Sequence, residues 1–316
     1  MGSPFTISAY PGDACAGPRA PYKEAGLESA ILTAYCEIER VEALLTDFRD
    51  SPLNALNAAA GGGPVKVPPE LFELVDFSLG ICRDSSGAFD ITFSAVGMLW
   101  REAFRTGIPP SDAAIERALP LVDYSRVELD RSAAAIRLPE KGMRIGLGSI
   151  GKGYGVDRAY KVLRDLGVEN FCVNGAGDLR LSSGAGAPRP WRVAIKNPFA
   201  ADERAAGYIE VRRGAVVTSG DYERYFIHQE RKYHHIIDAR SGWVRSDIAA
   251  VTVAASTACL ANACTISTMA LGPGEGLAFL KRRRDASGII ITSEGEVVNC
   301  GMKTSQGKGI PNAAKS

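Results

Sequence analysis

Histidine is scarce in this chain of 316 residues and occurs only three times, at His228, His234 and His235. Cysteine occurs seven times but never forms the C-x-x-C pair that is typical of structural zinc sites. The odd number and the scattered positions also argue against a disulfide framework, so we expect reduced thiols in a cytoplasmic protein. The cysteines are Cys15, Cys36, Cys82, Cys172, Cys259, Cys264 and Cys300.

An excess of charge of one sign is also absent. Lys and Arg total 37 against 36 for Asp and Glu, so the composition does not favour a nucleic-acid partner. No apolar run approaches the roughly 18 residues that a membrane span needs. The first ten residues lack the basic start and apolar core of a secretory signal. We therefore expect a cytoplasmic globular protein that binds a small molecule and has no membrane span.

Apolar periodicity predicts helices early in the chain and mostly strands later. Residues 27–45 carry apolar side chains at three- and four-residue steps, and a second such helix starts at residues 68–70 and has its last buried position at Cys82. Residues 48–57 between these helices read as a loop. Further helices are expected at 156–166, 260–271 and 275–281, and strands at 5–10, around 145, and at 171–174, 191–195, 208–212, 215–218, 233–237, 249–254, 288–292 and 296–300.

The order of these elements indicates the fold class. Helices are grouped, and strands often follow one another without an intervening helix, which is typical of an α+β fold with mainly antiparallel sheets and packed helices. We expect one domain over residues 1–303 and a polar tail over residues 304–316.

A glycine-rich segment runs from Gly146 to Gly153 and satisfies the G-x-G-x-x-G dinucleotide pattern. A Rossmann site also needs an acidic residue at the end of the next strand, whereas Glu169 precedes that strand. The P-loop pattern fails because Gly153 replaces the Ser or Thr that would hold magnesium. The sequence leaves two interpretations, a turn that contacts phosphate and a tight turn that allows close packing.

Four polar residues are candidates for chemistry. His234 and His235 are adjacent in a predicted strand, so their side chains point to opposite faces and cannot easily share a metal. One buried, hydrogen-bonded histidine beside one exposed histidine is the alternative to a catalytic role. Asp90 and Asp178 both lie in glycine-containing turns, where a carboxylate can contact a ligand or only stabilise the turn.

In order and spacing, these segments together resemble the FAD:protein FMN transferases, the ApbE-like flavin transferases, from end to end. The matching segments are residues 1–3 with M-G-[ST], 50–57 with D-S-x-[LI]-S-x-[LF]-N, 87–92 with G-x-F-D-x-T, 148–157 with G-G-I-[AG]-K-G-Y-x-x-D, 174–178 with N-x-G-G-D, 218–222 with T-S-G-x-Y, and 234–242 with H-H-I-[IL]-[DN]-x-x-[TS]-G.

The resemblance implies an α+β fold that binds FAD in an elongated groove. It also implies Mg²⁺-assisted attack by a Thr or Ser hydroxyl of a target protein on the FMN phosphorus, with AMP as the leaving group. His235 would orient or deprotonate that hydroxyl, and Lys152 would face phosphate or form a structural ion pair. The implied FAD contacts are Met1, Phe48, Ala88, Phe89, Asp90, Gly148, Tyr154 and Ile236, and the metal positions are Gly151, Asn262 and Thr265.

The sequence departs from the family pattern at the metal segment. The pattern A-D-A-x-[ST]-T reads here as A-N-A-C-T-I, so Asn262 replaces the acidic residue and Ile266 replaces the last threonine. Asn262 keeps a carbonyl oxygen but lacks the charge that Mg²⁺ prefers. Thr265 is adjacent to Ile266, but on a helix it points about 100° away. FAD binding is therefore better supported than catalysis.

Four functions follow from these observations. The first is an active flavin transferase with an altered metal shell. The second is a catalytically impaired FAD-binding paralogue that stores, delivers or senses flavin. The third is a hydrolase that splits FAD into FMN and AMP, and the fourth is a Rossmann oxidoreductase. We expect the first.

Overall fold

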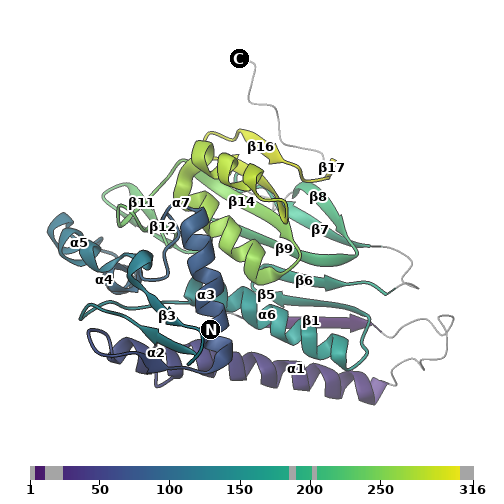
Figure 1. Cartoon of the computed structure of the whole chain (residues 1–316). Helices are drawn as coiled ribbons and strands as arrows, with labels where there is room; N and C mark the ends of the chain where they lie inside the picture. Colours follow the sequence, from purple (N-terminus) through teal and green to yellow (C-terminus); the bar gives the residue numbers. More distant parts are fainter. Residues whose placement is uncertain (1–3, 11–23, 185–189, 201–204, 307–316) are drawn as a thin grey trace.

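The computed structural model describes residues 4–10, 24–184, 190–200 and 205–306 (Figure 1). Helices and antiparallel sheets share the fold, which confirms the predicted α+β class. The helices are α1 (Glu24–Leu45), α2 (Pro52–Ala58), α3 (Pro69–Asp84), α4 (Ser94–Thr106), α5 (Asp112–Ala118), α6 (Gly148–Asp165) and α7 (Ala258–Arg282), with 3-10 turns η1 (Leu119–Leu121) and η2 (Tyr124–Arg126).

The largest sheet has seven strands in the order β1-β5-β6-β9-β14-β15-β16, and all its neighbours pair antiparallel. These strands are β1 (Phe5–Tyr10), β5 (Asn170–Gly175), β6 (Asp178–Ser182), β9 (Arg213–Gly220), β14 (Ile248–Ala255), β15 (Ala286–Thr292) and β16 (Val297–Cys300). The smaller sheets are β17-β8-β7 (Ser305–Gln306, Ala205–Val211, Trp191–Lys196), β2-β4-β3 (Val65–Lys66, Ala135–Arg137, Glu128–Asp130), β10-β11 (Tyr225–His228, Arg231–His234) and β12-β13 (Ile237–Asp238, Trp243–Val244).

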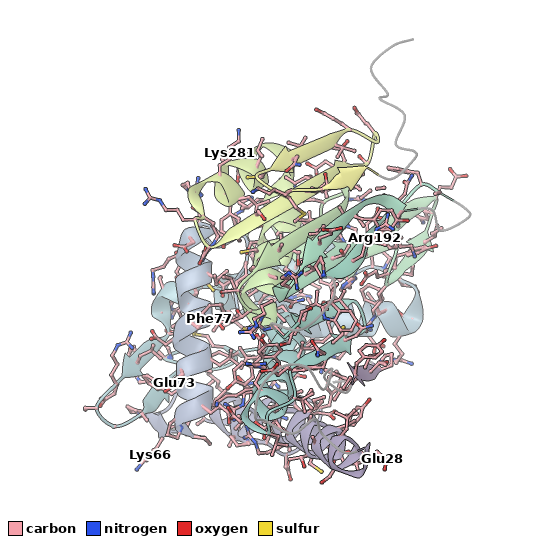
Figure 2. All side chains as sticks on the ribbon, turned by 90° about the vertical axis from the view of Figure 1, so that its right-hand side faces the viewer. Glu28, Lys66, Glu73, Phe77, Arg192 and Lys281 are labelled. Carbon is pink, nitrogen blue, oxygen red and sulfur yellow. The ribbon has the colours of Figure 1, made fainter. Side chains whose placement is uncertain are left out.

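Apolar side chains on both faces of the central strands are buried, so both faces of the large sheet are covered. Val217 and Val251 join the core that the helices α1, α3, α6 and α7 cover. Their neighbours Val216 and Ala250 join a second core with Ile209 of the sheet β17-β8-β7. Because successive side chains of a strand point to opposite faces, the large sheet lies between a helical layer and a small sheet. Figure 2 shows α3, labelled at Glu73 and Phe77, on the opposite side from β7, labelled at Arg192.

The two predicted amphipathic helices are confirmed. In α1, buried side chains recur at the predicted spacing of three or four residues, and in α3 all five predicted core residues are buried. Burying such aliphatic side chains stabilises the fold by about 1.5–3 kcal/mol each. The buried residues are Ala34, Ile38, Val41 and Leu45 in α1, and Leu71, Leu74, Val75, Leu79 and Cys82 in α3.

The prediction of a loop over residues 48–57 was wrong from Pro52 onward, where α2 begins. Ser51 caps this helix, because its Oγ accepts a hydrogen bond from the Asn54 amide at 2.9 Å, and Pro52 occupies the first turn. The prediction of a strand near residue 145 was also wrong, since only an isolated bridge between Phe93 and Arg144 forms there. Helix α6 begins at Gly148, not near 156 as predicted.

Two later predictions need correction as well. The predicted strand 233–237 is divided between β11 and β12. The predicted helices 260–271 and 275–281 belong to α7, which is interrupted at Gly272 by a non-helical φ of 81° just before Pro273. The closing hairpin is confirmed as β15 and β16. Of the predicted tail, Ser305–Gln306 form β17 beside β8, and residues 307–316 lie outside the described residues.

Candidate functional site

The glycine-rich segment brings α6 close to the start of α7. A Cβ atom on Gly153 would lie 2.6 Å from the Ala258 carbonyl oxygen, so only glycine allows this approach. One turn later, the Asp157 carboxylate accepts hydrogen bonds from the amides of Ala258 and Cys259, each at 2.8 Å. These contacts favour close packing over a phosphate-binding turn as the role of Gly153, and they fix the first turn of α7.

A buried carboxylate is the centre of the candidate site. The Asp178 side chain is 1% exposed, and its Oδ1 lies 3.2 Å from the Lys152 ammonium. Its Oδ2 accepts a hydrogen bond from Asn262 Nδ2 at 2.9 Å. Asp178 begins β6, Lys152 lies in the first turns of α6, and Asn262 lies in the first turns of α7. Three elements that are distant in sequence therefore meet at this carboxylate.

Burial raises the pKa of the Asp178 carboxyl to about 7. The nearby carboxylates of Glu223 and Asp157 add to this effect, while the Lys152 ammonium opposes it by favouring the ionised form. Perturbed carboxyl groups of this kind are frequent in functional sites.

The Thr265 hydroxyl is occupied on both sides. Its Oγ1 donates to the Asn262 carbonyl oxygen at 2.9 Å, so the Ser219 hydroxyl, at 2.8 Å, donates to Thr265. The Asn262 Oδ1 atom is buried and has no hydrogen-bond partner in the described part of the chain. Asn262 thus offers a single neutral oxygen, and the Thr265 hydroxyl, also neutral, keeps only one lone pair beside these two hydrogen bonds.

The two adjacent histidines differ in their hydrogen bonds. His234 is buried, and its Nε2 faces the Arg245 carbonyl oxygen at 2.5 Å while its Nδ1 accepts from the Ile236 amide at 3.2 Å. Both ring nitrogens of His234 are therefore used, and its role is structural.

His235 is exposed, and its Nδ1 lies 3.2 Å from the Arg224 carbonyl oxygen. Because a carbonyl only accepts, the proton sits on Nδ1, which leaves Nε2 able to take a proton. Surrounding protein lowers the pKa of His235 to about 4 although part of the residue is accessible, and the charges of Arg224 and Lys152 contribute. The imidazole is therefore neutral near pH 7, as a base must be.

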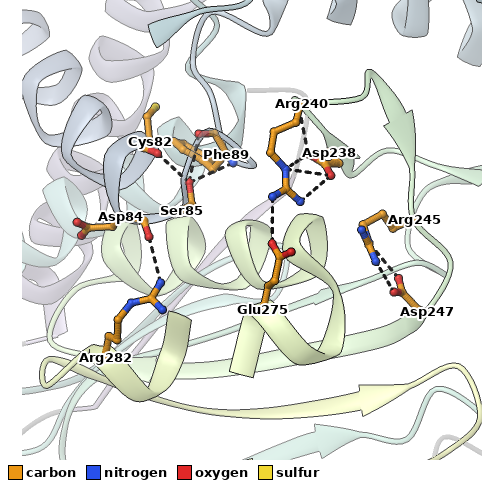
Figure 3. Close-up of polar contacts among 10 residues, drawn as sticks. All are labelled: Cys82, Asp84, Ser85, Phe89, Asp238, Arg240, Arg245, Asp247, Glu275 and Arg282. Atoms are coloured by element: carbon orange, nitrogen blue, oxygen red, sulfur yellow. Dashed lines mark hydrogen bonds and ion pairs between the residues drawn. The ribbon is translucent and has the colours of Figure 1, made fainter. Parts of the chain in front are cut away.

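The predicted FAD-binding turn at residues 88–90 is held by the loop after β12. The Ala239 amide donates to the Ala88 carbonyl at 3.1 Å, and Arg240 of the same loop forms ion pairs with Asp238 and with Glu275 of α7 (Figure 3). Figure 3 also shows Ser85 hydrogen-bonded to Phe89, within the turn itself.

The carboxylate of Asp90 accepts three hydrogen bonds inside the fold. Oδ1 accepts from the amide and the hydroxyl of Thr92, each at 2.7 Å, and Oδ2 accepts from the Tyr124 amide at 2.9 Å. Burial raises the pKa of Asp90 despite these bonds. Of the two roles that the sequence allowed for this side chain, turn stabilisation is the one with contacts.

Phe48 is one of the exposed residues among the predicted FAD contacts. Its side chain follows α1, is 78% exposed, and packs under the Arg101 guanidinium, which lies 4.1 Å from the ring centroid. Asp47 holds that guanidinium at 2.6 Å. An exposed aromatic ring in a fixed position is suited to stacking against a heterocycle.

The remaining predicted FAD contacts are placed differently. The Tyr154 hydroxyl donates to Glu70 at 2.6 Å, within a charged network with Arg40 that joins α1, α3 and α6. Gly148 begins α6, and a Cβ there would meet no atom within 4 Å. Ile236 is buried directly after the two histidines, and Met1 lies outside the described residues.

The predicted magnesium ligands do not fit the ion as these side chains are arranged. Gly151 lies inside α6, where helical amides use the carbonyl groups. Asn262 presents its NH₂ group to Asp178, and the neutral Thr265 hydroxyl already makes two hydrogen bonds. Mg²⁺ is usually held through one or two carboxylates. Among the described residues, no three His, Cys, Asp or Glu side chains are grouped to hold a metal.

The structure therefore brings together Lys152, Asp178, Asn262 and Thr265, and the positive charge of Lys152 contributes to the lowered pKa of His235. The sequence analysis missed Ser219 as a partner of Thr265, although the T-S-G-x-Y segment contains it. It also missed Arg101, for which the sequence carries no signal, because the contact depends on how α4 meets the end of α1.

Among the described helices, none combines the length and apolar character that crossing a bilayer requires. Residues 1–291 match the model of the ApbE family.

Comparison with known proteins finds relatives of similar length. A FAD:protein FMN transferase of Klebsiella pneumoniae (strain 342) is 30% identical over 300 residues, covering 94% of this chain and 89% of the relative. One from Treponema pallidum is 31% identical over 274 residues, covering 81% and 75%. The apo crystal structure of Pseudomonas stutzeri flavinyl transferase ApbE superposes with a TM-score of 0.77 at 26% identity, covering 96% of this chain and 95% of that one.

Proposed function

The chain belongs to the ApbE family, and we propose that it is a FAD:protein FMN transferase. It would move FMN from FAD to a Thr or Ser hydroxyl of a target flavoprotein and release AMP. FAD is then a substrate rather than a resident cofactor, and the partner is the protein that carries the acceptor hydroxyl.

The observation that supports this proposal most directly is the hydrogen bond of His235 to the Arg224 carbonyl. With the Nδ1 proton directed at the Arg224 carbonyl, Nε2 can accept the proton of the acceptor hydroxyl. The hydroxyl oxygen then bonds to the FMN phosphorus as the phosphoanhydride bond to AMP breaks, and AMP leaves with that bridging oxygen. The neutral state of His235 near pH 7 supports this role.

Phosphoryl transfer needs charge neutralisation and positioning more than covalent help. We assign charge neutralisation to Lys152, whose ammonium is within electrostatic range of His235. Phe48 would stack on a ring of FAD, and the backbone of residues 88–90, with Gly148, Tyr154 and Ile236, would complete the FAD site. A magnesium site at Gly151, Asn262 and Thr265 stays a prediction that the contacts described above do not favour.

The alternative of an FAD-binding protein without catalysis is not favoured. The hydrogen bond of His235 uses Nδ1 and leaves Nε2 able to act as a base. A protein that only stores FAD needs no base at this position. The relatives that cover most of the chain are also named as transferases.

The experiment compares His235→Gln with His228→Gln in an assay of AMP release and covalent flavin on a threonine-containing acceptor. His228 is a matched control because it lies in the same hairpin and also bonds a backbone carbonyl, that of Gly107. We expect His235→Gln to bind FAD normally but to lose about 10²–10⁴-fold in rate, the usual contribution of a general base, and His228→Gln to retain activity. An undiminished rate in His235→Gln would show that the base lies elsewhere.

A further inference from the structure

One oxygen of the buried Asp178 carboxylate accepts a hydrogen bond, and the other is held by an ion pair alone. Lys152 Nζ is 3.2 Å from Oδ1, and Asn262 Nδ2 is 2.9 Å from Oδ2. The Lys152 side chain is 22% exposed, so its ammonium lies between the buried carboxylate and solvent. An ammonium has three donors, and besides its ion pair with Asp178 the Lys152 ammonium donates to the Ala176 carbonyl at 3.5 Å.

The charges of this cluster balance without a metal ion. When Asp178 is ionised, the Lys152 ammonium balances its charge, and Asn262 carries none. A carboxylate in place of Asn262, as in the family pattern, would add a second negative charge beside Asp178, and a buried unpaired charge is strongly destabilising. The amide removes that charge and donates a hydrogen bond instead.

The oxygen donors that remain are too few for a divalent cation. Two buried side-chain oxygens of the cluster have no hydrogen-bond partner among the described contacts, Asn262 Oδ1 and Asp178 Oδ1. The Lys152 ammonium is already ion-paired with Asp178 Oδ1, and Asn262 Oδ1 is neutral, whereas Mg²⁺ sites in proteins usually include carboxylates that are free to bind the ion. These side-chain oxygens are therefore poorly suited to bind Mg²⁺, the ion that the family pattern implies.

We infer that the Lys152 ammonium, held by Asp178 and Asn262, takes the place of a divalent cation, so that this chain binds FAD phosphates without Mg²⁺. The inference rests on the proposed function for its ligand. Asn262 is the positioning residue. Its amide holds the Asp178 carboxylate by a hydrogen bond, and that carboxylate holds the Lys152 ammonium in place of a metal ion.

The experiment measures metal binding by the whole chain without flavin. Thermal unfolding of the unsubstituted protein should have the same midpoint in EDTA and in excess MgCl₂, and Mn²⁺ added to it should give only the electron paramagnetic resonance signal of the free ion. Asn262→Asp should lower the midpoint in EDTA, regain it in MgCl₂ and bind Mn²⁺. FAD titrations of the unsubstituted protein should give one Kd in both buffers.

Asn57→Asp is the matched control, since Asn57 is also buried and also makes specific hydrogen bonds, to the Ile145 backbone. Its midpoint should fall without recovery in MgCl₂. Stoichiometric Mn²⁺ binding by the unsubstituted protein, or a midpoint that rises with MgCl₂, would overturn the inference even if Asn262→Asp does not fold. Failure of FAD to bind would count against the proposed function, while the flavin-free metal measurements would still decide this inference.

Discussion

At the scale of single residues, one hydrogen bond separates the roles of His234 and His235. Both lie at the end of the same hairpin, but His234 uses both ring nitrogens inside the fold, whereas His235 uses only Nδ1. Alternation along the chain predicted that one would be buried and one exposed. It could not predict which carbonyl each ring would meet, because Arg224 and Arg245 are brought there by tertiary structure.

The lowered pKa of His235 gives a direct prediction. Because surrounding protein and the positive charges of Lys152 and Arg224 disfavour the imidazolium, the ring should stay neutral until the pH falls toward about 4. In a proton NMR titration, the Cε1 proton of His235, assigned by its loss in His235→Gln, should not shift between about pH 7.5 and 5.5. A titration midpoint near 6.5, the ordinary histidine value, would contradict this description of the site.

The exposed ring of Phe48 gives a second prediction at this scale. Phe48→Ala removes a stacking surface, which typically costs about 1–3 kcal/mol, and should weaken FAD binding by about 5- to 150-fold in calorimetric titration. Phe199→Ala is the control, since Phe199 is another exposed phenylalanine at 56% exposure. Equal FAD affinity in both variants would remove Phe48 from the proposed site.

At the scale of elements, the candidate site depends on how closely α6 approaches α7. Gly153 sets that distance and Asp157 caps the first turn of α7, so the two residues place Lys152 and Asn262 on either side of Asp178. The sequence showed these glycines as a dinucleotide pattern. A G-x-G-x-x-G segment also serves helix packing, and no strand leads directly into this one.

Gly153→Ala tests this packing. The added Cβ would lie 2.6 Å from the Ala258 carbonyl oxygen, which is backbone and cannot rotate away, so α6 and α7 must separate. We expect a loss of about 1–3 kcal/mol in the free energy of unfolding, measured by urea denaturation. Gly148→Ala, whose Cβ meets no atom within 4 Å, should change stability little or increase it by up to about 1 kcal/mol. Equal stability of the two variants would show that the helices are not in tight contact.

At the scale of the whole molecule, hydrophobic periodicity was sufficient to predict the α+β class, the long helices α1 and α3, and the closing hairpin. It did not predict α2, although Ser51 and Pro52 are ordinary helix-start signals. The helix is short and has too few apolar residues among its alanines and asparagines to show a clear helical period. The motif segments located most of the candidate site. The pairing of Lys152 with Asp178 and the orientation of the Asn262 amide could not be predicted, since both depend on contacts between distant elements.

The central claim is that this chain transfers FMN intact from FAD to a protein hydroxyl. The most direct test incubates the purified chain with FAD and a threonine-containing acceptor protein, and compares the AMP released with the flavin covalently attached, by chromatography and intact-protein mass spectrometry. The account predicts one AMP for each acceptor that gains one FMN, with the modification at a Thr or Ser. AMP accompanied by free FMN and an unmodified acceptor would identify a hydrolase, and no AMP at all would leave only flavin binding.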